Sequence, residues 1–306
     1  MDDLDLSEQG IRGRIAVAFP DVQVQELVLN RSGWNYIVAV VNSSIVFRFP
    51  RRRGLEQKLR KEIALISALK DFPVRLPEYF LIPTTGDFFA GYRYIQGFPL
   101  NGAKILGKGL LRDSVRILKF LSGYNATVLP VKGIAAYSPE RWIKDRVEGV
   151  AKTFRKVLSR YLGEDYFDMV SERINSSLGN LNEKDMVLSH GDLFRGNVVI
   201  NTKHSCINGV IDWEDASIGD IALDIAALGK DFHPLYTRKL VSSIGKADTG
   251  IMKRVEFYRW FEPLYTAYHE VQLGKYGDSL RVEGHLPGFG KSFPANSMNG
   301  HGVHKK

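Results

Sequence analysis

The sequence predicts an α+β protein of two lobes, in which a small β-rich lobe precedes a larger and mainly helical one. Residues 24–50 are rich in β-branched and aromatic side chains between turn residues, which is typical of strands. Residues 110–181 instead place apolar side chains at helical spacing. We therefore expect an N-terminal lobe at residues 1–96, a C-terminal lobe at residues 97–280 and a flexible tail, rich in Gly, Pro, Ser and Asn, at residues 281–306.

The small lobe is predicted to contain three strands followed by a helix. The strands are expected at residues 24–29, 36–41 and 45–49. The helix is expected at residues 55–69, where leucine and isoleucine recur every three or four positions.

The loop between the first two strands contains Ser32 and Gly33. Two interpretations of this loop remain open, a simple turn or a loop whose backbone approaches the phosphates of a nucleotide. Its spacing differs from the G-x-G-x-x-G pattern of kinases, so the loop is only a candidate for phosphate binding.

Arg48 is a charged residue inside an apolar strand, and such a residue needs a partner. Glu62, on the predicted helix, is a candidate for that partner. A strand cation held by a helix carboxylate is the arrangement with which kinases bind the α- and β-phosphates of a nucleotide. The alternative is an edge-strand charge and a solvated helix residue that do not meet.

A further strand, within residues 88–100, ends in glycine and proline and is predicted to link the lobes. In that position the backbone around Tyr94 and Ile95 is expected to pair with the edge of a nucleobase. Backbone recognition leaves little trace in the side chains, so the identity of the base stays open.

The segment from His190 to Asn197 carries the pattern H-x-D-x-x-x-x-N, and Asp212 follows a second apolar run after it. Two strands joined by a polar turn would form a hairpin with Asn197 and Asp212 at its open end. Transfer of a phosphoryl group needs a carboxylate for the accepting hydroxyl and oxygen ligands for Mg²⁺. Asp192, Asn197 and Asp212 supply these groups, so the segment predicts a phosphoryl-transfer site.

Composition excludes several other classes of function. The chain has 306 residues, 44% hydrophobic and 25% charged, and no apolar run approaches the length of a membrane span. Its N-terminus does not have the pattern of a secretory signal, so a cytoplasmic protein is expected. The single cysteine, Cys206, excludes an intramolecular disulfide. The net charge of +8 is spread along the chain without a nucleic-acid-binding signature, so we expect neither nucleic acid nor membrane as partner.

Residues 20–275 resemble the aminoglycoside phosphotransferase family, the antibiotic kinases that share the protein-kinase fold with choline and macrolide kinases. The resemblance lies in residues 188–197, in the segment from Gly209 to Trp213, and in Gly219-Asp220 with Asp224 and Ile225. It implies a monomeric kinase that uses ATP or GTP and Mg²⁺. Its implied roles are a catalytic base for Asp192, magnesium ligands for Asn197 and Asp212, and support of the catalytic loop for His190 and Asp220.

Two features leave the subfamily open. The family usually has lysine where Arg48 stands, and the run Arg48-Phe49-Pro50-Arg51-Arg52 is similar to macrolide kinases. Asn197 and residues 89–100 look closer to aminoglycoside 2''-phosphotransferases.

The acceptor is expected to bind in the helical lobe, between carboxylates suited to the ammonium groups of an aminoglycoside and aromatic side chains suited to a macrolide. The leading hypothesis is an aminoglycoside, with a macrolide or a small metabolic alcohol such as choline or a sugar as alternatives. A nucleotide-binding module without catalysis is the remaining hypothesis. The candidate acceptor residues are Glu214, Asp215, Asp231, Trp260 and Glu262.

Overall fold

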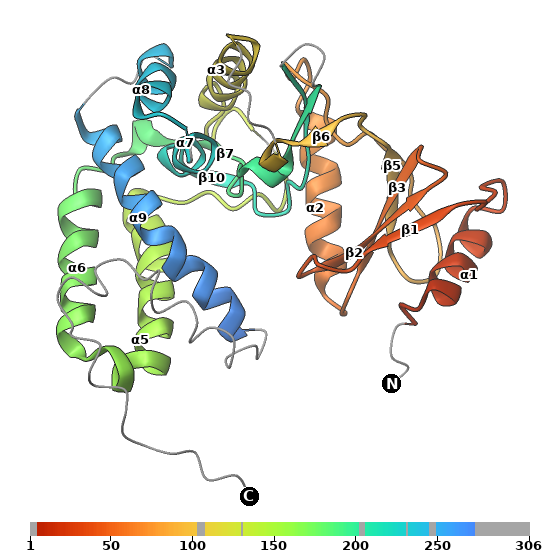
Figure 1. Ribbon diagram of the computed structural model, residues 1–306, viewed down its shortest axis with the longest axis horizontal. Helices are drawn as coiled ribbons and strands as arrows, with labels where there is room; N and C mark the ends of the chain where they lie inside the picture. Colours follow the sequence, from red (N-terminus) through yellow and green to blue (C-terminus); the bar gives the residue numbers. More distant parts are fainter. Residues whose placement is uncertain are drawn as a thin grey trace, which may run out of the picture.

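An antiparallel sheet with one helix on each face forms the N-terminal lobe (Figure 1). The computed structural model describes residues 5–102, 108–129, 131–201, 206–230, 232–244 and 249–272, so the tail expected at residues 281–306 lies outside the described residues. The sheet order is β1-β2-β3-β5-β4, and all neighbouring strands are antiparallel. The strands span Leu27–Asn30 (β1), Tyr36–Val41 (β2), Ile45–Pro50 (β3), Tyr79–Leu81 (β4) and Ala90–Arg93 (β5).

Alternation along the strands gives the sheet two different faces. Phe47 and Phe49 of β3 pack with Ile11 and Ile15 of helix α1 (Glu8–Ala18) in one buried cluster. Arg48, between those two phenylalanines, therefore points to the other face, because successive side chains of a strand alternate. Helix α2 (Leu55–Ala68) covers that face and lies between the sheet and the large lobe (Figure 1).

The strands and the helix predicted for this lobe are confirmed, whereas α1 was missed. Helix α1 buries only Ile11 and Ile15, which is too weak a periodic pattern to stand out in the sequence. Its N-terminus is capped by the Ser7 hydroxyl, which accepts a hydrogen bond from the N–H of Gly10.

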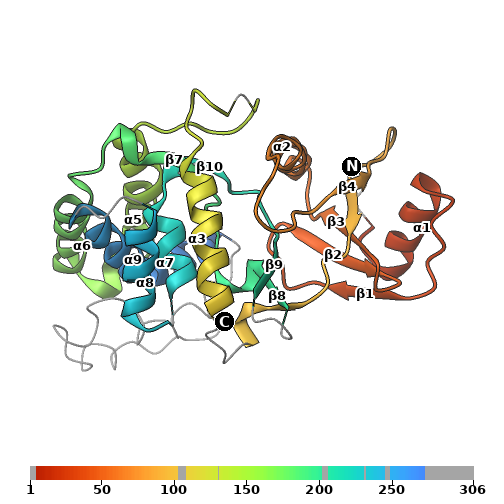
Figure 2. The same ribbon diagram turned by 90° about the horizontal axis from the view of Figure 1, so that it is seen from above.

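A small three-stranded sheet connects the two lobes. Strand β6 (Phe98–Pro99) pairs with β8 (Val198–Asn201), which pairs with β9 (Cys206–Val210). After β5, the last strand of the first lobe along the chain, strand β6 therefore pairs directly with the β8–β9 hairpin, which carries the predicted site. Figure 2 shows this hairpin between the two lobes.

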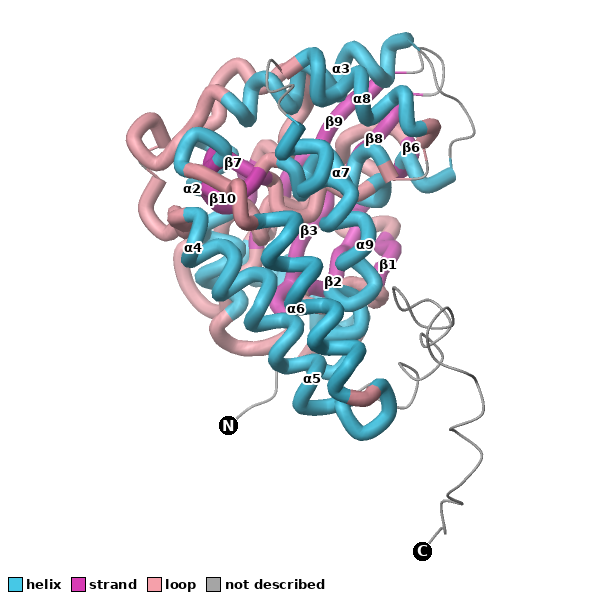
Figure 3. The backbone as a smooth tube through the Cα atoms, turned by 90° about the vertical axis from the view of Figure 1, so that its left-hand side faces the viewer, coloured by secondary structure: helices cyan, strands magenta, loops and turns pink. Residues whose placement is uncertain are grey.

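The C-terminal lobe packs its helices around a short antiparallel pair, β7 and β10, and around the residues between β7 and β8. Figure 3 shows these helices in front of the strands when the large lobe faces the viewer. The remaining strands span Met186–Ser189 (β7) and Ser217–Asp220 (β10), and the helices span Lys108–Ser122 (α3), Pro139–Trp142 (α4), Gly149–Leu162 (α5), Glu164–Leu178 (α6), Ala222–Gly229 (α7), Pro234–Ser243 (α8) and Thr249–Gln272 (α9). Short helical turns span Leu100–Gly102, Ile143–Glu148, Glu183–Asp185 and Arg195–Asn197.

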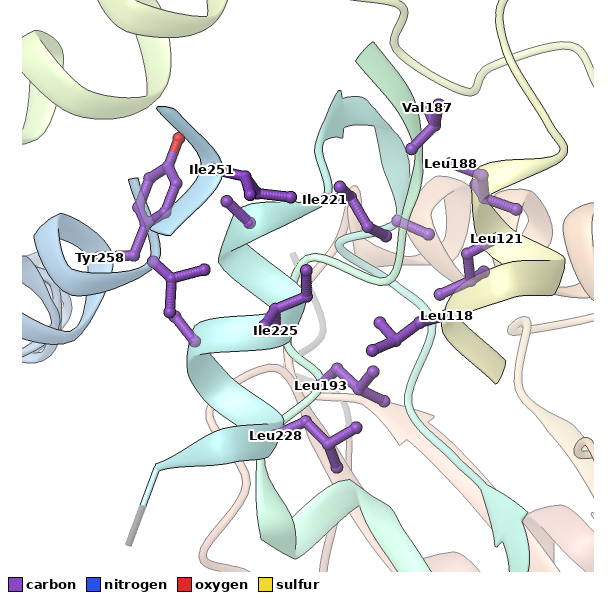
Figure 4. Close-up of a cluster of buried hydrophobic side chains, with 14 of the residues drawn as sticks. Leu118, Leu121, Val187, Leu188, Leu193, Ile221, Ile225, Leu228, Ile251 and Tyr258 are labelled. Carbon is purple, nitrogen blue, oxygen red and sulfur yellow. The ribbon is translucent and has the colours of Figure 1, made fainter. Parts of the chain in front are cut away.

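The core of this lobe extends up to the predicted catalytic loop. Leu193, in the middle of that loop, is buried against Leu118 of α3 and Ile225 and Leu228 of α7 (Figure 4). Burying one leucine side chain contributes about 1.5–3 kcal/mol, so this contact fixes the loop firmly to the helices beneath it. Within the described parts of the chain, no helix is both long enough and apolar enough to cross a membrane. The two-lobed α+β fold predicted from the sequence is confirmed.

Candidate active site

The loop between β7 and β8 carries Asp192 at the surface of the large lobe. Gly191 has a φ of +81°, and a Cβ atom there would lie 2.5 Å from the backbone oxygen of Asp215. This position therefore requires glycine. The next residue, Leu193, is buried and anchors the loop, while Asp192 is exposed.

Asp224 of helix α7 holds this loop from below. Its carboxylate is fully buried and accepts hydrogen bonds from the backbone N–H of His190 at 2.7 Å and of Gly191 at 3.1 Å. Burial raises the pKa of Asp224 to about 7, and the hydrogen bonds from His190 and Gly191 act against that shift. The bracing contact expected of Asp220 is thus made by Asp224, four residues later.

Asp220 has a different structural role, which corrects the expectation from the sequence. It is fully buried and accepts hydrogen bonds from Arg254 Nε at 2.9 Å and from the hydroxyl of Tyr258 at 3.1 Å. The backbone N–H of Ala222 donates to its other oxygen. The contacts with Arg254 and Tyr258 tie strand β10 to helix α9, and none of the three contacts involves the loop from His190 to Asn197.

His190 supports the loop through both ring nitrogens. Nε2 lies 3.1 Å from the backbone oxygen of Ile211, and Nδ1 lies 3.3 Å from the backbone nitrogen of Asp192. Because Nδ1 accepts a hydrogen bond from that N–H, the ring proton is on Nε2 and the imidazole is neutral. Burial lowers the pKa of His190 to about 4, which agrees with a neutral ring. The ring also packs against Trp213, 4.5 Å away between centroids.

The predicted hairpin brings Asn197 and Asp212 together. Val198 pairs with Val210, and the backbone N–H of Ile211 donates to the oxygen of Asn197 at 3.0 Å. Asp212 follows with a φ of +68°, a conformation that side-chain-bearing residues rarely adopt. The two ends of the hairpin thus lie side by side, as predicted.

The amide of Asn197 is oriented by Asp192. Its Nδ2 donates to the backbone oxygen and to Oδ2 of Asp192, at 2.9 and 3.0 Å. Its Oδ1 then faces away from Asp192 and, with the Asp212 carboxylate, forms a pair of hard oxygen donors. No group of three His, Cys, Asp or Glu residues suited to a metal occurs in the described residues. Two oxygen donors nevertheless fit Mg²⁺, which keeps several waters and shares the phosphates of its nucleotide.

Asp192 lies in an electronegative environment. Its side chain meets solvent, yet it is crowded by protein atoms, and this desolvation raises the pKa of its carboxyl above the usual range. The charges of Asp212, Asp215 and Glu214 raise it further, whereas the hydrogen bond from Asn197 acts against the shift. A carboxylate with raised proton affinity is suited to accept a proton from a hydroxyl.

The predicted partners Arg48 and Glu62 are in direct contact. Nη1 of Arg48 lies 2.6 Å from Glu62 Oε2, and Nη2 lies 2.7 Å from Asp212 Oδ1. Tyr36 stacks under the guanidinium at 4.2 Å, and the hydroxyl of Tyr79 donates to Glu62 Oε1 at 2.9 Å. Arg48 is 4% exposed, so its charge is balanced inside the protein by both carboxylates.

The guanidinium fork explains how arginine can occupy this strand position. It has two terminal nitrogens, and each contacts a different acid. Asp212 and Glu62 raise the pKa of Arg48, although desolvation alone would lower it. Burial raises the pKa of Glu62 to about 7, with Arg48 acting in the opposite direction. The contact between Arg48 and Asp212 was not predicted from the sequence.

The loop with Ser32 and Gly33 is held by side chains on both sides. The side-chain oxygen of Asn30 accepts hydrogen bonds from the backbone N–H and the hydroxyl of Ser32, at 2.9 and 2.7 Å. Arg51 donates to the backbone oxygens of Gly33, at 2.8 Å, and of Arg31. The loop is therefore ordered by Arg51, a residue that the motif analysis did not assign to it.

The linker around Tyr94 and Ile95 is fixed at both ends. The backbone N–H of Tyr94 donates to the oxygen of Ser44 at 2.8 Å, and the oxygen of Gln96 accepts from Asn208 Nδ2 at 2.5 Å. The buried side chain of Ile95 lies close to Gly209, where an added Cβ atom would approach it to 2.8 Å.

The four predicted acceptor residues that the structure describes fall into two groups with different contacts. Glu214 accepts a hydrogen bond from Asn35 Nδ2 at 2.9 Å, and Lys58 lies 4.0 Å from its carboxylate and 3.6 Å from that of Asp215. Both acids therefore lie where the lobes meet. Asp231 lies outside the described residues.

The other two candidates, Trp260 and Glu262, lie on helix α9. Trp260 packs with Phe257 and Phe261 and has Arg173 over its ring at 5.0 Å. Glu262 pairs with Lys230 at 2.5 Å, and both side chains are nearly half exposed. Neither contact joins them to Glu214 or Asp215.

An exposed aromatic ring beside Asp192 was missed. Phe194 is 43% exposed and lies two residues after Asp192 on the same loop. Its ring lies over Gly196, where a Cβ atom would come within 2.3 Å of it. The sequence carries no clear signal for this exposure, because Leu193 and Phe194 are consecutive apolar residues and only the structure shows that the first is buried and the second exposed.

The chain is similar in sequence or in fold to known phosphotransferases. The profile of the phosphotransferase enzyme family matches residues 24–258. The GDP and kanamycin complex of APH(2")-IIIa has a TM-score of 0.78 with 22% identity, over 90% of this chain and 97% of that chain. Macrolide 2'-phosphotransferase type I has a TM-score of 0.71 with 18% identity, over 94% of this chain and 99% of that chain. These similarities show a shared fold.

A match in sequence covers a shorter region. Viomycin phosphotransferase from Streptomyces vinaceus is 32% identical over 91 residues, which are 29% of this chain and 32% of that protein. The aligned part therefore spans about a third of the relative.

Proposed function

The chain belongs to the phosphotransferase enzyme family, as its motifs predicted, and we propose that it phosphorylates a hydroxyl of an aminoglycoside antibiotic and thereby confers resistance. The donor in this proposal is ATP or GTP. The observation that carries it is the convergence of Arg48, Asp192, Asn197 and Asp212 where the two lobes meet. Structures with similar folds include a GDP and kanamycin complex and a streptomycin and ATP complex, which supports both parts of the proposal.

Each residue has a role that follows from its position. The Arg48 guanidinium, held by Glu62, would bind the α- and β-phosphates. Asn197 and Asp212 would hold Mg²⁺, which neutralises charge on the phosphates when bound. The linker backbone around Tyr94 and Ile95 would contact the base.

Asp192 would orient the acceptor hydroxyl and take its proton. In the reaction, the acceptor oxygen forms a bond to the γ-phosphorus while the bond from that phosphorus to the β,γ-bridging oxygen breaks. The products are a phosphate ester and a nucleoside diphosphate, and the proton passes to the carboxylate of Asp192. Its raised pKa favours this proton transfer.

A cationic acceptor is supported by the charges around Asp192. Asp212, Asp215 and Glu214 lie close enough to raise the pKa of Asp192, although the whole chain carries a net charge of +8. A ligand with several ammonium groups would be attracted to this local field. Phe194 would offer an apolar face to a sugar ring. An aminoglycoside combines both properties.

The proposal is tested by incubating the protein with Mg²⁺, ATP or GTP, and separate panels of aminoglycosides, macrolides, choline and simple sugars. Mass spectrometry should detect an aminoglycoside with one added phosphoryl group. The control is Asp192→Asn protein purified in the same way. Phosphorylation restricted to macrolides, choline or sugars would assign the alternative substrate, and no product from any panel would reject the proposal.

A further inference from the structure

Lys61 of helix α2 contacts the segment that follows Asp212. Its Nζ donates to the backbone oxygen of Glu214 at 2.5 Å and to that of Ala216 at 3.2 Å. The helix belongs to the small lobe and the segment to the large lobe, so these hydrogen bonds cross the boundary between them (Figure 1).

The next residue on α2, Glu62, connects the helix to the strand cation. Glu62 holds Arg48, and Arg48 also contacts Asp212. One turn of α2 therefore holds both halves of the site, the strand cation through Glu62 and the metal-ligand segment through Lys61. Asn35, which precedes β2, adds a third contact by donating to the carboxylate of Glu214 at 2.9 Å.

The backbone at Asp212 requires such support. A φ of +68° is costly for a residue with a side chain and persists only when neighbouring contacts impose it. On one side, the N–H of Ile211 is bound to Asn197. On the other side, the ammonium group of Lys61 donates to the carbonyls of Glu214 and Ala216, two and four residues after Asp212, and so fixes this segment. Lys61 is partly buried, and this burial lowers the pKa of its ammonium group.

We propose that Lys61 is a positioning residue. It fixes the position of the Asp212 carboxylate relative to the Arg48 guanidinium, so that the metal at Asp212 and the phosphates at Arg48 can bind at the same time. This inference rests on the proposed function. It assigns Glu214 to the joint between the lobes, through its backbone oxygen and its carboxylate, instead of to the acceptor. Lys61 acts through Asp212 and is not expected to touch the substrate.

The experiment measures binding of a non-hydrolysable ATP or GTP analogue while the Mg²⁺ concentration is varied. Lys61→Met removes the donors but keeps an apolar stem of similar length. It should raise the Mg²⁺ concentration for half-maximal nucleotide binding about tenfold, the lower end of the loss found when a residue that orients a metal ligand is removed. In turnover, kcat should fall while the KM of the acceptor changes little. Lys61→Arg, which can still donate to two carbonyls, should recover most of the loss.

Lys58→Met is the matched control. It removes the same charge from the same helix one turn earlier, but Lys58 is 43% exposed and its contacts to Glu214 and Asp215 are 3.6–4.0 Å long. Its effect on Mg²⁺ dependence should be less than about threefold. Thermal unfolding of each variant shows whether it is folded, and Lys61→Gln, which removes the charge and shortens the side chain, provides a second variant.

An unchanged Mg²⁺ requirement in folded Lys61→Met or Lys61→Gln would overturn the inference, as would an equal shift in Lys58→Met. The proposed function fails separately, in the wild-type protein, if nucleotide binding does not respond to Mg²⁺ or no acceptor is phosphorylated.

Discussion

Replacing Asp224 should damage catalysis more than replacing Asp220, although both carboxylates are fully buried. Asp224→Ala leaves the N–H of His190 without its acceptor, whereas the N–H of Gly191 keeps the hydroxyl of Ser189 at 3.1 Å. A buried donor without a partner costs about 1–3 kcal/mol. Part of this is recovered because the buried carboxylate, with a pKa raised to about 7, is itself costly. We expect the free energy of unfolding to fall by about 1–2 kcal/mol.

Asp220→Ala should lower the free energy of unfolding by more, for another reason. Arg254 is 1% exposed and would keep only the carboxylate of Asp185, at 3.4 Å, as an ion-pair partner within the described residues. Removing one partner from a buried ion pair typically costs about 3–5 kcal/mol. The catalytic loop makes none of these contacts, so its geometry should persist.

The assay combines urea unfolding with steady-state kinetics on the milder Asp224→Asn and Asp220→Asn variants, at a temperature where both are folded. A displacement of about 1 Å at a reacting group can reduce turnover about 100-fold, and we expect a loss of that order in kcat for Asp224→Asn. Asp220→Asn should stay within about threefold of the wild type, because its contacts lie away from the loop. An equal loss of kcat in both variants, or an unchanged kcat in Asp224→Asn, would refute the assignment of the loop contact.

Three further predictions concern the site itself. Asp192→Asn should lower kcat about 10²–10⁴-fold with little change in nucleotide affinity, checked by titration calorimetry, since the carboxylate acts on the acceptor; a large loss of nucleotide affinity would contradict this. Because the pKa of His190 is lowered from 6.5 to about 4, the unfolded chain takes up a proton below pH 6.5 that the folded chain does not. Stability from this group is thus complete above pH 6.5, and about 3 kcal/mol is lost between pH 6.5 and 4. The free energy of unfolding of His190→Gln, measured with urea at each pH, should not show this loss. Parallel pH profiles for the wild-type protein and the variant would exclude the contribution of His190. Arg48→Lys should raise the KM of the nucleotide and reduce stability by about 1–3 kcal/mol, because one ammonium cannot reproduce the separate contacts to Glu62 and Asp212; unaltered values of both would argue against the two-armed contact.

The parts of the site that lie on one local element could be predicted from the sequence. Asn197 and Asp212 flank a single hairpin, so recognising its two strands from their apolar side chains was enough to predict that the two residues lie together. The pairing of Arg48 with Glu62 was also predictable, because a charge in an apolar strand demands a nearby partner.

Other parts could not be predicted because the choice between similar residues depends on packing. Asp220 ends strand β10 and Asp224 lies four residues later on helix α7, and only the docking of these elements decides which carboxylate contacts the loop after β7. The contact between Glu214 and Lys61 could not be predicted either, because the two residues come from different lobes and lie far apart in the sequence.

The sequence by itself thus determined the chemistry, because the order and spacing of His190, Asp192, Asn197 and Asp212 are local and follow from a loop and a hairpin. Only the tertiary structure decided how that chemistry is held in place. Helix α2 reaches across the boundary between the lobes: Glu62 holds Arg48, which contacts Asp212, and Lys61 contacts Glu214, 153 positions later. Contacts between distant segments depend on how the helices and the sheet pack, and periodicity along the chain carries no information about that packing.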